Sequence, residues 1–110
     1  MENHKKILNL LGLATKAGKT ASGGFMTENS VKGGKAFLVL VPEDASDNTK
    51  KMFFNMCTYY KVPIYLFGRK EELGHAIGRE ARTSVAVLDA GFSKALAKQI
   101  ELNGGSEYEG

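Results

Sequence analysis

The chain has 110 residues, 43% of them hydrophobic and 25% charged, and this length suits a single domain with its own core. Its net charge of +3 is compatible with an anionic partner but does not require one. One cysteine excludes an intramolecular disulfide, and no apolar stretch suits a signal peptide or a transmembrane helix, so we expect a cytoplasmic protein with no membrane contact.

Apolar periodicity predicts helices that alternate with short buried strands. Residues 4–17 have the stripe of an amphipathic helix, with Asn3 as a candidate N-cap and Gly18 placed to end it. A short polar link then leads to a pair of glycines. The elements that follow are a helix over 24–32, a buried strand over 36–41, a helix capped by Ser46, a buried strand over 63–67, a helix that starts at Gly68, a buried strand over 84–88 and a helix over about 92–102.

The alternation of strands and helices after residue 36 predicts the α/β fold class and a three-layer α/β/α sandwich. Strands that are apolar on both faces favour mainly parallel pairing among the three buried strands. We expect residues 1–102 to form one domain. Residues 103–110 are polar and rich in glycine, so we expect a disordered tail there.

The sequence lacks the patterns that enzymes, metal sites and cofactor sites usually require. The AGKT segment at 17–20 follows a helix and has the wrong glycine spacing for a phosphate-binding P-loop. No cluster of Cys and His has metal-ligand spacing, and Cys57 falls on a buried helical stripe. Asp44 and Asp89 each follow a strand, where they could accept a phosphoryl group or simply cap a helix, and we favour capping. We therefore predict no catalytic residue, no metal and no cofactor.

Two segments have the composition of a polyanion-binding site. The first is a glycine turn in the more basic part of the chain, where a partner could approach the backbone and the amides of the next helix. The second is the loop at 78–83, whose arginines suit phosphate. If the topology is correct, both lie on the same edge, although each could instead be an ordinary solvated turn or loop. The candidate residues are Lys16, Lys19, Gly23, Gly24, Lys32, Arg79 and Arg82.

Four further segments follow one another in an order typical of a known family. They are GGKAFLVLVPEDAS at 33–46, KVPIYLF at 61–67, EELGHAIG at 71–78 and SVAVLD at 84–89. In this order the chain resembles the ribosomal-protein superfamily of large-subunit proteins seven-A-e and thirty-e, and in particular its small bacterial branch. The resemblance implies a mixed four-stranded sheet with Thr20 to Ser22 as an extra strand. It also implies binding to a kink-turn, a sharply bent RNA helix with sheared G·A pairs and an extruded base.

The family pattern carries over to this chain only in part. In the family, a Gly-x-Asn-Glu pattern at the start of the second helix contacts the G·A pairs, a lysine follows one turn later, and the loop before the last strand holds the extruded base. Here Gly23 matches the glycine, Phe25 and Met26 replace Asn and Glu, and Asn29 replaces the lysine. Phe25 could stack on a base, but an apolar residue that opens a short helix is more often part of the core.

These observations predict a ribosome-associated protein that binds bent, structured, ribosomal RNA, and not DNA, by shape and through phosphate contacts. A second hypothesis is a protein-interaction module with the same fold, which contacts a protein partner through Phe25 and Met26. A small α/β enzyme or phosphoacceptor that uses Asp44 or Asp89 ranks last, because no base, metal cluster or phosphate loop accompanies these acids.

Overall fold

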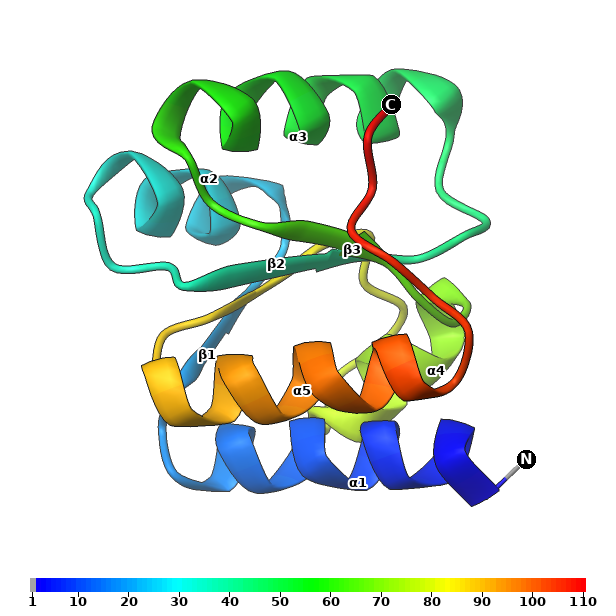
Figure 1. Cartoon of the computed structure of the whole chain (residues 1–110). Coiled ribbons are helices and arrows are strands. Elements are labelled where there is room, and N and C mark those ends of the chain that lie inside the picture. The colour runs from blue at the N-terminus through cyan, green and yellow to red at the C-terminus, as the bar shows by residue number, and fades with distance from the viewer. Residues whose placement is uncertain (1) are drawn as a thin grey trace.

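Helices cover both faces of a single sheet in the computed structural model, which describes residues 2–110. The elements are α1 (Glu2–Lys16), β1 (Thr20–Ser22), α2 (Gly24–Lys32), β2 (Leu38–Val41), α3 (Asp47–Tyr60), β3 (Ile64–Leu66), α4 (Lys70–Ala76), β4 (Val85–Val87) and α5 (Ala90–Leu102). Helices α1, α4 and α5 pack on one face and α2 and α3 on the other (Figure 1). The predicted three-layer α/β/α sandwich is confirmed, and so is the short strand β1.

The sheet is mixed and has the strand order β1-β4-β2-β3. Strands β2 and β3 are parallel, with Val39 opposite Ile64. Strand β4 lies antiparallel between β1 and β2, so that Ala86 is opposite both Ala21 and Val39. The mixed four-stranded sheet is therefore confirmed, whereas the prediction of mainly parallel pairing among the buried strands is wrong for β4.

The direction of β4 follows from the path of the loop after α4. A parallel strand would need a crossover that leaves the chain at the other end of the sheet. Helix α4 has seven residues, about 10 Å of helix, but the loop after it returns to the start of the helix. There the backbone N–H of Arg82 donates to the carbonyl of Lys70 at 3.0 Å. Strand β4 therefore begins at the end of the sheet where β3 finishes.

Strands β2, β3 and β4 each contribute to two separate cores, because successive side chains point to opposite faces. Leu38 and Leu40 pack with α1, α4 and α5, whereas Val39 and Val41 pack with α2 and α3. All four residues of β2 are buried, which explains the continuous apolar run in the sequence. Cys57 belongs to the second core, as its position on the helical stripe predicted.

Most predicted helix ends are confirmed. Gly18 adopts a φ of 74°, and the N–H of Lys19 donates to the carbonyl of Ala14 at 2.9 Å, which ends α1. The Ser46 hydroxyl accepts a hydrogen bond from the first turn of α3 at 3.1 Å. Two predicted helix starts are wrong: Asn3 lies inside α1 and is not an N-cap, and α4 begins at Lys70, two residues after Gly68.

Residues 103–110 run back along the outer edge of β3. The backbone N–H of Tyr108 donates to the carbonyl of Ile64 at 2.7 Å. The ring of Tyr108 meets the edge of the Phe54 ring, with 5.6 Å between centroids. These contacts cover the edge of the sheet, while the disorder expected from the composition of this segment stays a prediction.

The loop after α4 lies directly on the backbone of the helix at Gly74. A Cβ atom at this position would overlap with the backbone of Glu80, and the N–H of Arg79 donates to the carbonyl of Gly74 at 2.8 Å. The close approach therefore requires glycine, and it fixes where the arginine-containing loop lies.

Gly74→Ala is expected to lower the free energy of unfolding by about 1–3 kcal/mol, the usual cost of adding an atom to a closely packed contact. Urea denaturation, monitored by circular dichroism, measures this change in the free energy of unfolding. The matched control is Gly24→Ala, because no atom lies within 4 Å of the Cβ that it adds and helix propensity favours alanine there. An equal loss of stability in both variants would contradict the close approach at Gly74.

The burial of Cys57 should be visible in its reactivity. Burial raises the pKa of the thiol to about 12, because the thiolate would form away from water. Since the thiolate is the reactive form, iodoacetamide should label the folded protein near pH 8.5 far more slowly than the urea-unfolded chain. The unfolded chain ionises first as the pH rises, so this thiol should also lower stability above about pH 9. Equal labelling rates would contradict this expectation.

Candidate nucleic-acid interface

The glycine turn before α2 lies directly beside the start of β4. The N–H of Gly23 donates to the carbonyl of Ser84 at 3.1 Å, and its φ of 88° with ψ of 157° is a conformation that favours glycine. No atom lies within 4 Å of the Cβ positions of Gly23 and Gly24. A partner can therefore approach the first amides of α2, which carry partial positive charge.

A buried hydrogen bond between two hydroxyl groups holds α2 in this position. Ser84 Oγ donates to Thr27 Oγ1 at 2.9 Å, and both residues are fully buried. Breaking this pair would leave two hydroxyls without partners and without water, so it specifies one arrangement of α2 on the sheet. The sequence does not reveal this hydrogen bond, because 57 positions separate the two residues and no local pattern connects them.

Arg82 is oriented toward the glycine turn. Its Nε donates to Ser22 Oγ at 3.1 Å, and its Nη1 donates to the carbonyl of Ala81 at 3.2 Å. The turn and the arginine loop therefore lie on the same edge, as the topology argument expected, and Arg79 is exposed on the same loop. Ser22 was not singled out from the sequence, where its place next to the glycine pair was the only signal.

Phe25 and Met26 are exposed, with 74% and 52% of their surface accessible. The expectation that Phe25 belongs to the core is therefore wrong. Helix α2 buries a different and partly polar face, at the i, i+3, i+4 spacing of one helical stripe. The buried residues of that face are Thr27, Ser30 and Val31. An aromatic ring consequently stands at the surface beside the turn, and Asn29 is exposed one turn further on.

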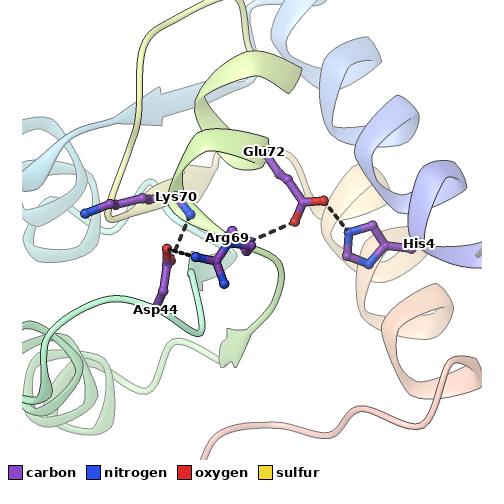
Figure 2. Close-up of polar contacts among 5 residues, drawn as sticks. All are labelled: His4, Asp44, Arg69, Lys70 and Glu72. Carbon is purple, nitrogen blue, oxygen red and sulfur yellow. Dashed lines mark hydrogen bonds and ion pairs between the residues drawn. The ribbon is translucent and has the colours of Figure 1, made fainter.

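A network of polar contacts fixes the start of α4 and with it the arginine loop (Figure 2). Asp44 accepts a hydrogen bond from the backbone N–H of Lys70 at 2.9 Å, and its other oxygen lies 3.5 Å from Arg69 Nη2. Glu72 accepts a hydrogen bond from the backbone N–H of Arg69 at 2.9 Å and lies 3.0 Å from His4 Nε2 of α1. The network ties α4 to α1 and to the segment after β2.

The two acids considered as phosphoacceptors both bond to helix starts. Asp89 accepts a hydrogen bond from the N–H of Phe92 at 2.8 Å and so caps α5. Asp44 is followed in the sequence by α3, but its carboxylate accepts a hydrogen bond from the first amide of α4. The predicted capping role is confirmed for Asp89, and Asp44 has an equivalent role at α4.

The lysines predicted to join the glycine turn lie at the other end of the sheet. The carbonyl of Lys19 accepts a hydrogen bond from Leu88, just beyond the end of β4, whereas Gly23 bonds to Ser84 at its start. The three residues of β1, about 10 Å of strand, separate these two ends. Lys16 and Lys32 are the last residues of α1 and α2 and lie at the Lys19 end. The structure thus brings the turn and the arginine loop together, but not these lysines.

Within residues 2–110, no three side chains of His, Cys, Asp or Glu are grouped so that they could hold a metal ion. None of the helices in that range has the length and apolar composition needed to cross a membrane.

The chain is similar to known proteins over most of its length. Residues 5–97 match the family described as ribosomal protein L7Ae/L30e/S12e/Gadd45. The chain is 44% identical over 92 residues to the RNA-binding protein YlxQ of Bacillus subtilis (strain 168), covering 84% of this chain and 92% of that relative. It is 37% identical over 99 residues to the RNA-binding protein YlxQ of Enterococcus faecium, covering 90% and 95%. A solved structure of a protein with unknown function from Bacillus halodurans C has a TM-score of 0.84 at 38% identity, covering 87% of this chain and 97% of that chain. The chain therefore belongs to the ribosomal protein L7Ae/L30e/S12e/Gadd45 family, as the order of its segments indicated.

Proposed function

We propose that this chain is an RNA-binding, ribosome-associated protein that recognises bent, structured RNA of the kink-turn type by shape and phosphate contacts. One observation carries the proposal: the glycine turn, the start of α2 and Arg82 lie together on one edge. The relatives support it, since those from Bacillus subtilis and Enterococcus faecium are described as RNA-binding proteins and the family is named after ribosomal proteins.

The RNA backbone docks on the glycine turn in this proposal. The N–H groups at the start of α2 favour an anion, and the open Cβ positions of Gly23 and Gly24 let a phosphate come close to them. Arg82 offers planar paired donors that match a phosphate, and Ser22 orients its guanidinium. Arg79 adds a second exposed charge on the same loop.

Phe25 lets this site select RNA in a different way from the Asn and Glu of the family pattern. The family pattern places Asn and Glu where this chain has Phe25 and Met26, and neither of these side chains can hydrogen-bond to the edges of G·A pairs. An exposed aromatic ring can instead stack on an unpaired base of any identity. We therefore infer that RNA shape and an unstacked base determine selectivity here, more than base edges do.

A kink-turn RNA should bind more tightly than an unbent duplex of equal length. We expect log affinity to fall linearly with log salt, by about 0.7–0.9 per phosphate contact. Arg82→Glu should weaken kink-turn binding about tenfold or more and reduce the slope by about one contact. Fluorescence anisotropy across a salt series measures both quantities.

The matched control for Arg82→Glu is Lys98→Glu, which also replaces a basic residue by an acidic one, at an exposed position of α5. Equal and weak binding of both RNAs would contradict kink-turn recognition and leave general binding to the RNA backbone. If Arg82→Glu leaves the affinity for the kink-turn RNA unchanged, the proposed site is contradicted.

Phe25→Ala should weaken kink-turn binding by about 1–3 kcal/mol, the range for one base stacked on an aromatic ring. The salt dependence should stay unchanged, because stacking releases no counterions. Leu102→Ala is the control, since it also truncates an exposed apolar side chain, 65% exposed, but lies at the end of α5 and away from the glycine turn. The same anisotropy measurement distinguishes the two variants.

The exposure of Phe25 and Met26 also favours a second candidate function, in which this pair docks on a protein partner. An apolar contact of this kind resists high salt, because screening acts on charges and not on buried apolar area. In that case Phe25→Ala would leave RNA affinity unchanged and abolish salt-resistant capture of the partner.

A further inference from the structure

The end of the sheet opposite the glycine turn collects loops from all three layers. Strands β1, β2 and β3 begin there, because β4 is antiparallel to β1 and β2 while β3 is parallel to β2. Helices α1, α2 and α3 lead into these strands and therefore end there, and α5 starts there after β4 (left side of Figure 1). Side chains from distant parts of the sequence thus share one surface.

Six exposed lysines lie on this surface, which we call the lysine end. They come from helix ends, from the segments before β1, β2 and β3, and from the second turn of α5. The N–H of Phe37 donates to the carbonyl of Val87 at 2.9 Å, and Phe37 and Lys94 line the same hollow, which places α5 beside the start of β2. The members of the lysine end are Lys16, Lys19, Lys32, Lys35, Lys61 and Lys94.

Acidic groups offset this charge only in part. Glu28 pairs with Lys32, with 2.6 Å between Oε2 and Nζ. Asp89 is bonded to the start of α5, and the acids of residues 103–110 lie along β3 on the side of Lys61. Among the described residues, Lys35 and Lys94 form no ion pair. The surface therefore keeps a positive charge.

Stabilisation of helix ends does not account for the whole cluster. A lysine in the last turn of a helix is favourable, and this explains Lys16 and Lys32. Lys35, in contrast, lies beyond the end of its helix. Lys94 lies in the first half of α5, where the helix dipole offers a positive charge no advantage. Positive charge gathered without such a local reason indicates an anionic partner.

Exposed aromatic rings stand among the lysines. Phe37, Tyr59 and Tyr60 are 49%, 78% and 40% exposed, and the two tyrosine rings meet edge to face with 4.9 Å between centroids. Cationic groups that bind phosphates, combined with rings that stack on bases, are the usual means of binding nucleic acid without sequence preference. The combination favours RNA over an acidic protein surface.

We propose that the lysine end is a second RNA-binding surface, separate from the glycine turn, so that one copy of the protein holds two RNA segments at once. The two surfaces lie at opposite ends of the same strands. The second contact is made mainly to phosphates and is therefore independent of RNA sequence. The charge and topology of this end support the second contact by themselves, whereas the simultaneous binding of two segments rests on the function proposed for the turn.

The test uses the full chain, a kink-turn hairpin with one fluorophore and a plain RNA hairpin with a second. Energy transfer reports simultaneous binding, and light scattering gives the mass of the complex. We expect one protein with both hairpins. The double variant Lys35→Glu/Lys94→Glu should weaken capture of the plain hairpin about tenfold or more and reduce its salt slope by about 1.4–1.8, the value for two phosphate contacts. The kink-turn hairpin should stay bound.

Two further variants separate the possible outcomes. Lys5→Glu/Lys98→Glu makes the same change in net charge at exposed helix positions elsewhere, and it should keep both hairpins. Arg82→Glu should lose the kink-turn hairpin and keep the plain one, so a failure at the turn is distinguishable from a failure at the lysine end. The proposal is overturned if the protein binds one hairpin at a time, if two protein copies are needed for two hairpins, or if both double variants weaken capture equally.

Discussion

The antiparallel insertion of β4 between β1 and β2 determines where every candidate binding residue lies. With Ser22 opposite Val85 and Thr20 opposite Val87, the two ends of β1 belong to two different surfaces. One end meets the arginine loop, and the other meets the lysine end. If β4 were parallel to β2, the arginine loop would arrive among the lysines. The direction of a single three-residue strand therefore separates a surface of backbone amides and arginines from a surface of lysines.

The charge of Arg82 remains available because neutral groups orient it. Its guanidinium donates to a hydroxyl and a carbonyl, and within the described residues no carboxylate lies in ion-pair range of it. Arg69 lies nearby in the sequence but pairs with Asp44 and serves to anchor α4. The two arginines thus differ in what they contact, since a carboxylate partner uses the charge of Arg69 within the fold whereas neutral partners leave the charge of Arg82 available.

The sequence predicted the positions of the helices and buried strands well, because burial leaves a local and periodic signal such as the apolar run at 36–41. Strand direction depended on how far the chain travels between β3 and β4, which periodicity does not record. The face of α2 was misjudged for another reason. Its buried side carries Thr27 and Ser30 beside Val31, and their hydroxyls bond to Ser84 and to the carbonyl of Met26, while the larger apolar side chains of Phe25 and Met26 are exposed. The sequence indicated the glycine turn and the arginine loop as one candidate surface, but it wrongly added Lys16, Lys19 and Lys32 and did not reveal the contacts that support the turn.

Gly74 limits how this protein can diverge. The residue lies under the loop and not in the candidate interface, yet any side chain there would push against the backbone of Glu80. The displacement would pass along the loop to Arg82. A mutation at this site would therefore disturb the candidate interface from outside it, and related chains with another residue at position 74 should have a different loop length or conformation. The absence of one Cβ atom thus acts as a constraint on the evolution of the arginine loop.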